Sequence, residues 1–287
     1  MASKLTIAVL PLAGLGTRFL PLSKVMPKEL WPLLNHPMVE YIAEEAMASG
    51  AKKIILVLSP DKKAIIDYFR PIPAVMKILK EREKTSILQE LNHYDKKWQQ
   101  IKIDVVWQKK PLGDGHAVLQ AKPLFGKSPI MVSFGDDIII SKTPALAQLT
   151  RVFQKFGQPV LALKRVPKEK VSSYGIVGVK KIGQRLYRIT KIVEKPNIDS
   201  PPSCFAVVGK YVLNNEFIEY LNQAKPVFRK EIILAKTFEK MLEDGKIIYG
   251  YDIDGDWLEC GNVFDWLKSN LLLAKKNPNF KKIFKNF

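Results

Sequence analysis

The sequence predicts an α/β protein: a three-layer, doubly wound and mostly parallel sheet of Rossmann-like type, with a β-rich extension. Residues 5–58 have the pattern strand, glycine loop, amphipathic helix, strand, which is the crossover unit of a parallel pair. Strands and helices go on alternating to about residue 157, and short strands then follow one another without a long helix. With 287 residues, 47% of them hydrophobic, the chain has material for one large unit of this kind.

The first crossover unit is the best defined. The apolar run Leu5–Leu12 is typical of a buried parallel strand, and it ends directly in the glycine loop 13–16. A helix is expected next, since Pro37 stands at its first turn and Gly50 just past its end. Its apolar stripe has helical spacing: Val39, Ile42, Ala43, Ala46 and Met47. The run Ile54–Leu58 then predicts the second buried strand.

The remainder of the first half continues this alternation. Residues 75–100 have helical spacing, with an expected inward set of Met76, Leu79, Ile87, Leu88 and Leu91. Strands are predicted at Ile103–Trp107 and Pro129–Phe134, with a helix between them from His116 to Lys122. A second amphipathic stripe predicts a helix through Leu146, Leu149, Val152 and Phe153.

Beyond residue 158 the pattern changes to short strands. They are expected at Val160–Val166, Gly175–Lys180, Leu186–Glu194 and Phe205–Leu213. Helical spacing returns at Asn215–Gln223, Glu231–Glu243 and Phe264–Lys275. We therefore expect a single domain over 1–287, with a doubly wound half at about 1–157, a β-rich half at 158–262 and a C-terminal helix with a basic tail at 263–287.

Charge is the most unusual feature of the composition. The chain has 46 Lys and Arg against 28 Asp and Glu, a net charge of +18, which favours anionic partners. A nucleic-acid-binding protein remains an alternative on this ground alone, but no zinc-finger, RNA-binding or P-loop pattern occurs, and we expect no specific nucleic acid. No run is long enough for a membrane span and no signal peptide is evident, so we expect no membrane partner and a cytoplasmic location.

The loop after the first strand is a candidate ligand site. Glycines there let the backbone approach a phosphate or a base, although a plain turn is the commoner meaning of such a pattern. It is not the dinucleotide fingerprint, because Phe19 stands where the third glycine should be. Arg18 and Lys28 follow in a proline-stiffened stretch and could clamp a polyphosphate; the alternative is a solvated basic loop.

A pair of carboxylates ends a later predicted strand. Gly135 is followed by Asp136 and Asp137, which repel each other unless a cation or a positive side chain offsets their charge. Mg²⁺ is the natural candidate, because it takes a few carboxylates together with phosphate oxygens. A solvated Asx turn is the alternative, and these residues alone leave both open.

Together the motifs resemble those of a known family. They are GLGTRFLP (14–21), Lys24, PKE (27–29), Gln108, GDGHAV (113–118), GDD (135–137), YG (174–175), VEKP (193–196), VGKYVL (208–213) and CGN (260–262). In this order they resemble the sugar-1-phosphate nucleotidylyltransferases and, more narrowly, the bacterial UTP–glucose-1-phosphate uridylyltransferases. The resemblance covers about residues 7–275, and it implies that the half at about 1–157 binds the nucleotide and that the β-rich half at 158–262 binds the sugar.

The resemblance implies a reaction and a role for each residue. A glucose 1-phosphate oxygen would attack the α-phosphorus of UTP, giving UDP-glucose and pyrophosphate with the help of Mg²⁺. Arg18, Lys28, Asp136 and Lys195 would be the catalytic residues, with Arg18 and Lys28 on the triphosphate and Lys195 on the sugar phosphate. The uridine would lie on Ala13, Gly14, Leu15, Gly16, Glu29, Gln108 and Gly113, and the sugar on Gly175 and Glu194. Asp137 is counted with the substrate-binding residues, and Asp136 and Glu259 as metal ligands.

Three departures from the family pattern keep alternatives open. Residues 229–236 read RKEIILAK, where the family pattern is GDEIQLTD; Glu259 replaces an Asp; and Asp114 replaces an apolar residue. The alternatives are another base or sugar, for example dTTP, and a non-catalytic descendant that binds a sugar nucleotide. The resemblance also implies a homo-oligomer, either a dimer or a tetramer.

Overall fold

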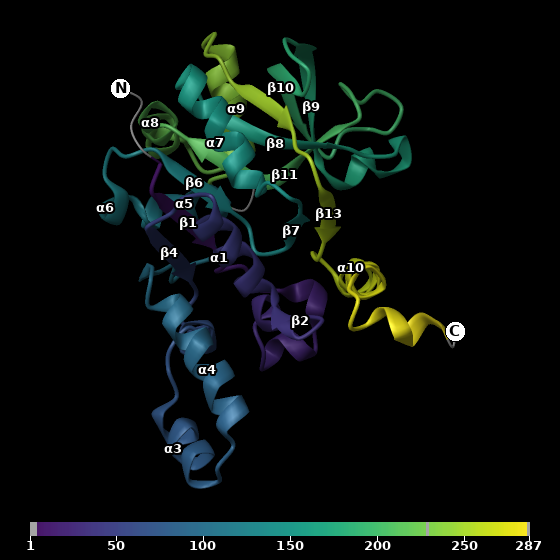
Figure 1. Cartoon of the computed structure of the whole chain (residues 1–287). Helices are drawn as coiled ribbons and strands as arrows, with labels where there is room; N and C mark the ends of the chain where they lie inside the picture. The colour runs from purple at the N-terminus through teal and green to yellow at the C-terminus, as the bar shows by residue number, and fades with distance from the viewer. Residues whose placement is uncertain (1–4, 228–229, 286–287) are drawn as a thin grey trace.

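The computed structural model describes residues 5–227 and 230–285 and is built on one nine-stranded sheet (Figure 1). The strand order is β5-β4-β1-β6-β11-β8-β12-β10-β9. Of the segment 229–236, Arg229 lies outside the described residues, as do the last two residues of the tail. Among the described helices, none combines the length and the apolarity needed to cross a membrane.

The first half of the sheet is parallel, as predicted. It contains β5 (Lys102–Trp107), β4 (Lys53–Leu58), β1 (Ile7–Pro11) and β6 (Ile130–Ser133). The β1 strand lies between β4 and β6 and pairs in parallel with both. Its apolar side chains are buried on both faces, which is why the sequence shows a continuous apolar run instead of alternation.

The β-rich half continues the same sheet and is largely antiparallel. It contains β11 (Phe205–Leu213), β8 (Val160–Arg165), β12 (Tyr249–Asp252), β10 (Leu186–Glu194) and β9 (Gly175–Lys181). The β11 strand joins the halves, because it pairs antiparallel with β6 on one side and with β8 on the other. The predicted extension is therefore a continuation of the central sheet.

Two short ribbons flank the sheet. In one, β7 (Asp137–Ile140) pairs with β13 (Asp256–Glu259), and in the other β2 (Pro32–Leu33) pairs with β3 (His36–Pro37). The sequence analysis did not predict these ribbons or β12, because strands of two to four residues carry too little periodicity.

Helices cover both faces of the sheet and give the three predicted layers. One core contains α1 (Met38–Ala48) and α7 (Ala145–Phe156). The opposite core contains α5 (Asp114–Gln120), α6 (Lys122–Phe125), α8 (Asn215–Gln223) and α9 (Leu234–Glu243). The short α2 (Lys63–Tyr68) follows β4, and α10 (Val263–Lys276) and a 3₁₀ turn at Lys281–Lys285 end the described chain.

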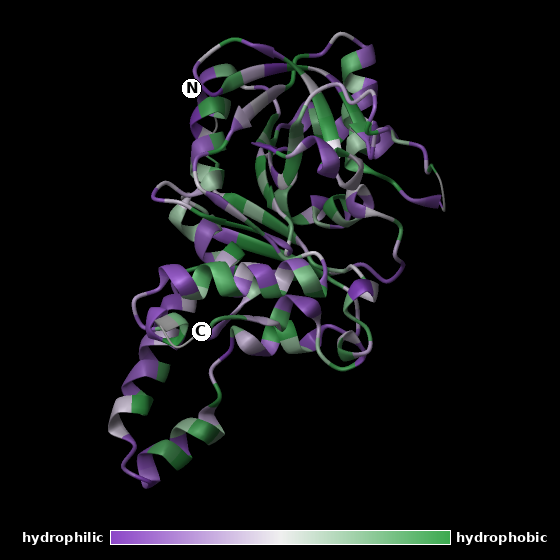
Figure 2. Ribbon diagram, turned by 90° about the vertical axis from the view of Figure 1, so that its right-hand side faces the viewer, coloured by the Kyte–Doolittle hydropathy of each residue, from purple (hydrophilic) through white to green (hydrophobic). Residues whose placement is uncertain are grey.

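The single helical stretch predicted at residues 75–100 is two helices that form an arm. The helices α3 (Pro73–Glu81) and α4 (Thr85–Trp98) are separated by Glu83, whose φ of 53° interrupts the helix. The arm extends away from the sheet, with apolar and polar residues mixed along it (Figures 1 and 2). The expectation that its apolar stripe faces the core is wrong: no α3 residue is buried and Ile87 is 50% exposed, since the two helices pack mainly on each other.

A buried ion pair ties the helices of the first core to the sheet. Lys210 of β11 is fully buried, and its Nζ lies 2.9 Å from Glu45 Oε2 and 2.8 Å from Ser133 Oγ. The other oxygen of Glu45 accepts the backbone N–H of Leu146, at the start of α7, at 2.9 Å. The pair thus connects α1, α7, β6 and β11, and each partner needs the other because a buried charge is costly alone.

Replacing Lys210 by Met should lower the free energy of unfolding by about 3 to 5 kcal/mol, since Glu45 is then buried without its cation. The double variant Lys210→Met/Glu45→Gln should lose less, because the amide keeps an acceptor for Leu146 without a charge. Urea unfolding at pH 7 measures both. If Lys210→Met proved at least as stable as the double variant, the interpretation would be contradicted.

Candidate active site

Two adjoining cavities open near the carboxyl ends of β1 and β6, where ligands bind in open α/β sheets. The first, here the loop cavity, has about 470 Å³ and is formed by the glycine loop. The second, here the sheet cavity, has about 600 Å³ and lies against the antiparallel half. Five residues line both cavities and mark where they meet: Arg18, Asp114, Phe134, Asp136 and Glu231.

The loop cavity brings together most of the residues singled out in the sequence. Gly16 has a left-handed φ of 64°, which a glycine adopts without strain and which turns the chain into the stretch that carries Arg18. Short 3₁₀ turns instead of a long helix lead from there to Lys28, in agreement with the effect expected of the prolines. The predicted residues lining this cavity are Ala13, Gly14, Leu15, Gly16, Arg18, Lys28, Glu29, Gln108, Gly113 and Asp136.

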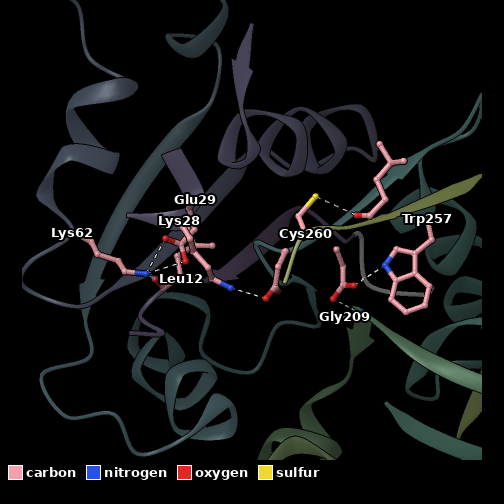
Figure 3. Close-up of polar contacts among 10 residues, drawn as sticks. Leu12, Lys28, Glu29, Lys62, Gly209, Trp257 and Cys260 are labelled. Atoms are coloured by element: carbon pink, nitrogen blue, oxygen red, sulfur yellow. Dashed lines mark hydrogen bonds and ion pairs between the residues drawn. The ribbon is translucent and has the colours of Figure 1, made fainter. Parts of the chain in front are cut away.

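A buried lysine that the sequence analysis missed supports this loop. Lys62 Nζ lies 2.9 and 2.8 Å from the two carboxylate oxygens of Glu29 and donates to the carbonyl of Leu12 at 2.7 Å (Figure 3). Glu29 and Lys62 are 1% and 3% exposed. The carboxylate predicted to contact uridine is therefore engaged by Lys62 below the cavity. No local pattern could reveal this pairing, because the partners lie 33 positions apart in different loops.

The boundary between the cavities carries opposed charges. Lys28 Nζ lies 2.6 Å from Asp136 Oδ2, and the Arg18 guanidinium is close enough to affect both. Burial alone would raise the pKa of Asp136, but Lys28 and Arg18 hold that pKa below its ordinary value. Burial alone would lower the pKa of Lys28, but Asp136 and Glu29 raise it. The site is therefore an ionised carboxylate beside two cations at neutral pH.

Gln108 is oriented by its neighbours. Its Nε2 donates to the carbonyl of Gly113 at 3.0 Å and lies 2.9 Å from His116 Nδ1. Burial lowers the pKa of His116, so its ring is neutral at pH 7 and only one of its two nitrogens accepts a hydrogen bond. The other nitrogen of the ring, Nε2, lies 3.2 Å from Gln120 Nε2, so the tautomer of His116 decides which of the two amides donates to the ring. Gln108 is thus held in the wall of the loop cavity by Gly113 and His116.

The sheet cavity collects the remaining predicted residues except Glu259. Gly175 of β9 and Glu194 of β10 are paired across the two strands, and a Cβ on Gly175 would lie 3.1 Å from Glu194 Oε2. Lys195 follows with a φ of 46°, a conformation that costs a non-glycine residue about 1 kcal/mol or more. Its N–H donates to the Tyr174 carbonyl at 3.0 Å, which holds this turn against the start of β9.

Asp137 lines the sheet cavity, but its carboxylate already accepts hydrogen bonds from neighbouring groups of the protein. It accepts the indole N–H of Trp257 at 2.7 Å and the backbone N–H of Gly209 at 3.1 Å (Figure 3). Burial, with the adjacent charge of Asp136, raises the pKa of Asp137 to about 7. In the structure this carboxylate therefore connects β7, β11 and β13, and its predicted contact with substrate stays a prediction.

Glu259 lies opposite Asp137 in the β7–β13 ribbon, and its Oε2 accepts the Tyr174 hydroxyl at 2.5 Å. It lines a separate cavity of about 320 Å³, and its role as a metal ligand stays a prediction. Cys260, the next residue of the chain, instead donates its N–H to the Asp136 carbonyl at 2.8 Å. Within residues 5–227 and 230–285, no cluster of three or more His, Cys, Asp or Glu side chains forms a metal site.

Several residues of the cavity walls were not predicted. They include Asp114 and Glu231 between the cavities and Tyr211, Ile233 and Phe238 in the sheet cavity. Asp114 and the segment that contains Glu231 were noticed only as departures from the family pattern. The aromatic residues have core spacing, which does not distinguish a cavity wall from an ordinary core residue.

Comparison with known proteins places this site in a family. The model of the nucleotidyl transferase family matches residues 7–276. The UTP–glucose-1-phosphate uridylyltransferase of Staphylococcus haemolyticus is 37% identical over 274 residues, which are 96% of this chain and 94% of that protein. The enzyme of the same name from Staphylococcus epidermidis is 35% identical over 285 residues, covering 99% and 97% of the two chains.

Solved structures agree with this result. A UTP-bound UGPase from Acinetobacter baumannii superposes with a TM-score of 0.89 at 31% identity, over 99% of this chain and 98% of that one. A UDP-glucose pyrophosphorylase complexed with UDP-glucose superposes with a TM-score of 0.84, also at 31% identity, over 96% and 100%. From the match over residues 7–276 and these full-length relatives, the chain belongs to the nucleotidyl transferase family.

Proposed function

We propose that this protein transfers a uridylyl group from UTP to glucose 1-phosphate, giving UDP-glucose and pyrophosphate. The observation that carries the proposal is the meeting of two cavities at Asp136, with Arg18 and Lys28 on one side and Lys195 on the other. Two anionic substrates need such an arrangement, because the cations offset their repulsion while the cavity walls hold the reacting atoms in line.

The protein's part in the reaction is to position and stabilise. A sugar phosphate is already an anionic nucleophile, so no general base is required. Arg18 and Lys28 would hold the triphosphate and stabilise the charge that develops on the leaving pyrophosphate. Lys195, which lines the sheet cavity, would hold the attacking phosphate.

Asp136 is our candidate for holding Mg²⁺. The residues fit this ion, since Mg²⁺ is commonly held by one or two carboxylates with substrate phosphates completing its shell, and Asp136 is ionised and lines both cavities. A bound Mg²⁺ would supply Lewis-acid stabilisation of the phosphate oxygens. Lys28 would exchange its contact with Asp136 for one with phosphate when the substrates enter.

Gln108 is our candidate for the residue that selects the base. It lines the loop cavity, and its amide oxygen would accept a hydrogen bond from the ligand. Uracil and thymine carry an N–H at position 3, whereas cytosine carries an acceptor there, so this geometry favours UTP or dTTP over CTP. The Gly175 backbone and the Glu194 carboxylate would bind the sugar hydroxyls.

We also propose a homo-oligomer and a cytoplasmic location. The helix α10 exposes Phe264 at 75%, Leu267 at 49% and Leu271 at 50%, which lie on one stripe at helical spacing. A second copy of the chain is the occupant we propose for this stripe. Both cysteines, Cys204 and Cys260, are free thiols, as is usual in a reducing compartment.

The reaction is tested by pyrophosphate release from a panel of nucleoside triphosphates and sugar 1-phosphates, with Mg²⁺ or with EDTA. We expect UTP with glucose 1-phosphate to react fastest and EDTA to stop release. Asp136→Asn should lower kcat by about 100-fold or more with an unchanged circular dichroism spectrum, because the metal loses its carboxylate. Binding of UTP without release from any pair would instead support a non-catalytic sugar-nucleotide-binding protein.

Replacing Lys195 by Ala should separate the two substrates. The KM for glucose 1-phosphate should rise about 10- to 100-fold, the size of a lost charged hydrogen bond, while UTP binding changes less than about twofold. Lys191→Ala is the matched control and should change neither constant, since Lys191 is an exposed lysine of β10, the strand that ends just before Lys195. Equal losses for both substrates would show that Lys195 does not act on the sugar phosphate.

The oligomer is tested by light scattering after size-exclusion chromatography. The native chain should elute as an oligomer, with a mass of at least two times 32.6 kDa. Phe264→Glu should give a monomer, because it places a charge in the apolar stripe. Lys275→Glu, which also changes the charge of α10, should leave the mass unchanged. A monomeric native protein at micromolar concentration would refute the proposal.

A further inference from the structure

The helix α9 begins without a cap of its own. The residue before it is Ile233, which has no side-chain acceptor, and the first turn carries no acidic residue. It carries Lys236 instead, whose ammonium bonds Glu239 at 2.6 Å. The first amides of a helix lack partners within it, and its N-terminal end favours a negative charge, so α9 needs an acceptor from elsewhere.

That acceptor comes from α5. Asp114 Oδ1 accepts the N–H of Leu234, the first residue of α9, at 2.9 Å across 120 positions of sequence. The same oxygen accepts the N–H of Gly115 at 2.7 Å, which fixes the carboxylate at the start of its own helix. Burial raises the pKa of Asp114 to about 6, so it is largely ionised at pH 7 and supplies the charge that α9 lacks.

Main-chain bonds hold the two helix starts together. The N–H of Ile232 donates to the Leu112 carbonyl at 2.8 Å, and the N–H of Gly115 donates to the Ile232 carbonyl at 2.9 Å. The contact is close, since a Cβ on Gly113 would lie 2.4 Å from the Ile232 carbonyl oxygen. Residues 230–234 therefore lie directly on the start of α5.

This junction forms a wall of both cavities. Asp114 and Glu231 line the loop cavity and the sheet cavity alike, and Ile233, Ala235 and Phe238 line the sheet cavity. The position of α9 on α5 therefore sets the shape of the sheet cavity. It also connects that cavity to Gly113, on the nucleotide side.

We propose that Asp114 is a positioning residue that caps α9 from α5 and thereby places the wall of the sugar-phosphate site. In this chain the negative charge that the start of α9 favours comes from the neighbouring helix, since position 236 of α9 is Lys and the acceptor is Asp114 of α5. That the sheet cavity takes a sugar phosphate rests on the proposed function; the cap itself does not.

The test moves the charge back to the helix. Asp114→Leu removes the acceptor, and we expect the Leu234 amide to exchange hydrogen about five- to tenfold faster, the size of a lost cap. The KM for glucose 1-phosphate should rise by a similar factor, with UTP affinity changed less than twofold. Asp114→Leu/Lys236→Asp should recover both properties. Lys236→Asp alone is the control and should change neither by more than about twofold.

Two results would overturn the proposal. One is an unchanged Leu234 exchange rate in Asp114→Leu, which would show that Asp114 does not cap α9. The other is a folded double variant that exchanges as fast as Asp114→Leu, which would show that charge at the helix start is not the cause. The exchange measurement needs no substrate, so it decides the cap even if no variant transfers a nucleotidyl group and the proposed function fails.

Discussion

The site depends on how the charge of two adjacent carboxylates is offset at the end of one buried strand. Asp136 and Asp137 are adjacent residues that follow β6 in the chain. Burial disfavours the charged forms of both carboxylates. Lys28 and Arg18 stabilise Asp136 from the glycine loop, while Trp257 and Gly209 donate hydrogen bonds to Asp137 from the opposite side. Opposite surroundings give the two carboxylates opposite roles, since Asp136 remains an ionised group open to both cavities and Asp137 becomes an internal connection with a raised pKa.

The rest of the fold holds these partners in place. Lys28 is positioned through the next residue of its loop, Glu29, which is paired with Lys62. Gly209 belongs to β11, the strand that also carries the buried Lys210. Each of these buried charges, on Glu29, Lys62 and Lys210, has a specific partner from a different part of the chain. These pairs therefore select one arrangement of loops, helices and strands, because any displacement leaves a charge without its partner.

The sheet explains why two cavities meet at one carboxylate. Its parallel half presents the glycine loop and Asp136 at one edge, and β11 then reverses direction and brings the antiparallel half alongside. Gly175, Glu194 and Lys195 thus face the same boundary as the loop that precedes Lys28. The junction of α5 with α9 closes the wall common to both cavities, so the nucleotide side and the sugar side share residues as well as a border.

The sequence by itself determined the parallel half, the places of four later strands along the chain and many of the residues around the cavities. These features can be recognised from local sequence patterns: apolar runs, apolar stripes at helical spacing, glycines beside strand ends and the ordered motifs of a family. Tertiary structure alone decided that Lys62 engages Glu29, that Glu259 turns to Tyr174, that Asp114 caps α9, and that residues 73–98 form an arm. The physical reason is that local periodicity states which face of an element is apolar, whereas the partner of a charged group is set by a contact between distant segments.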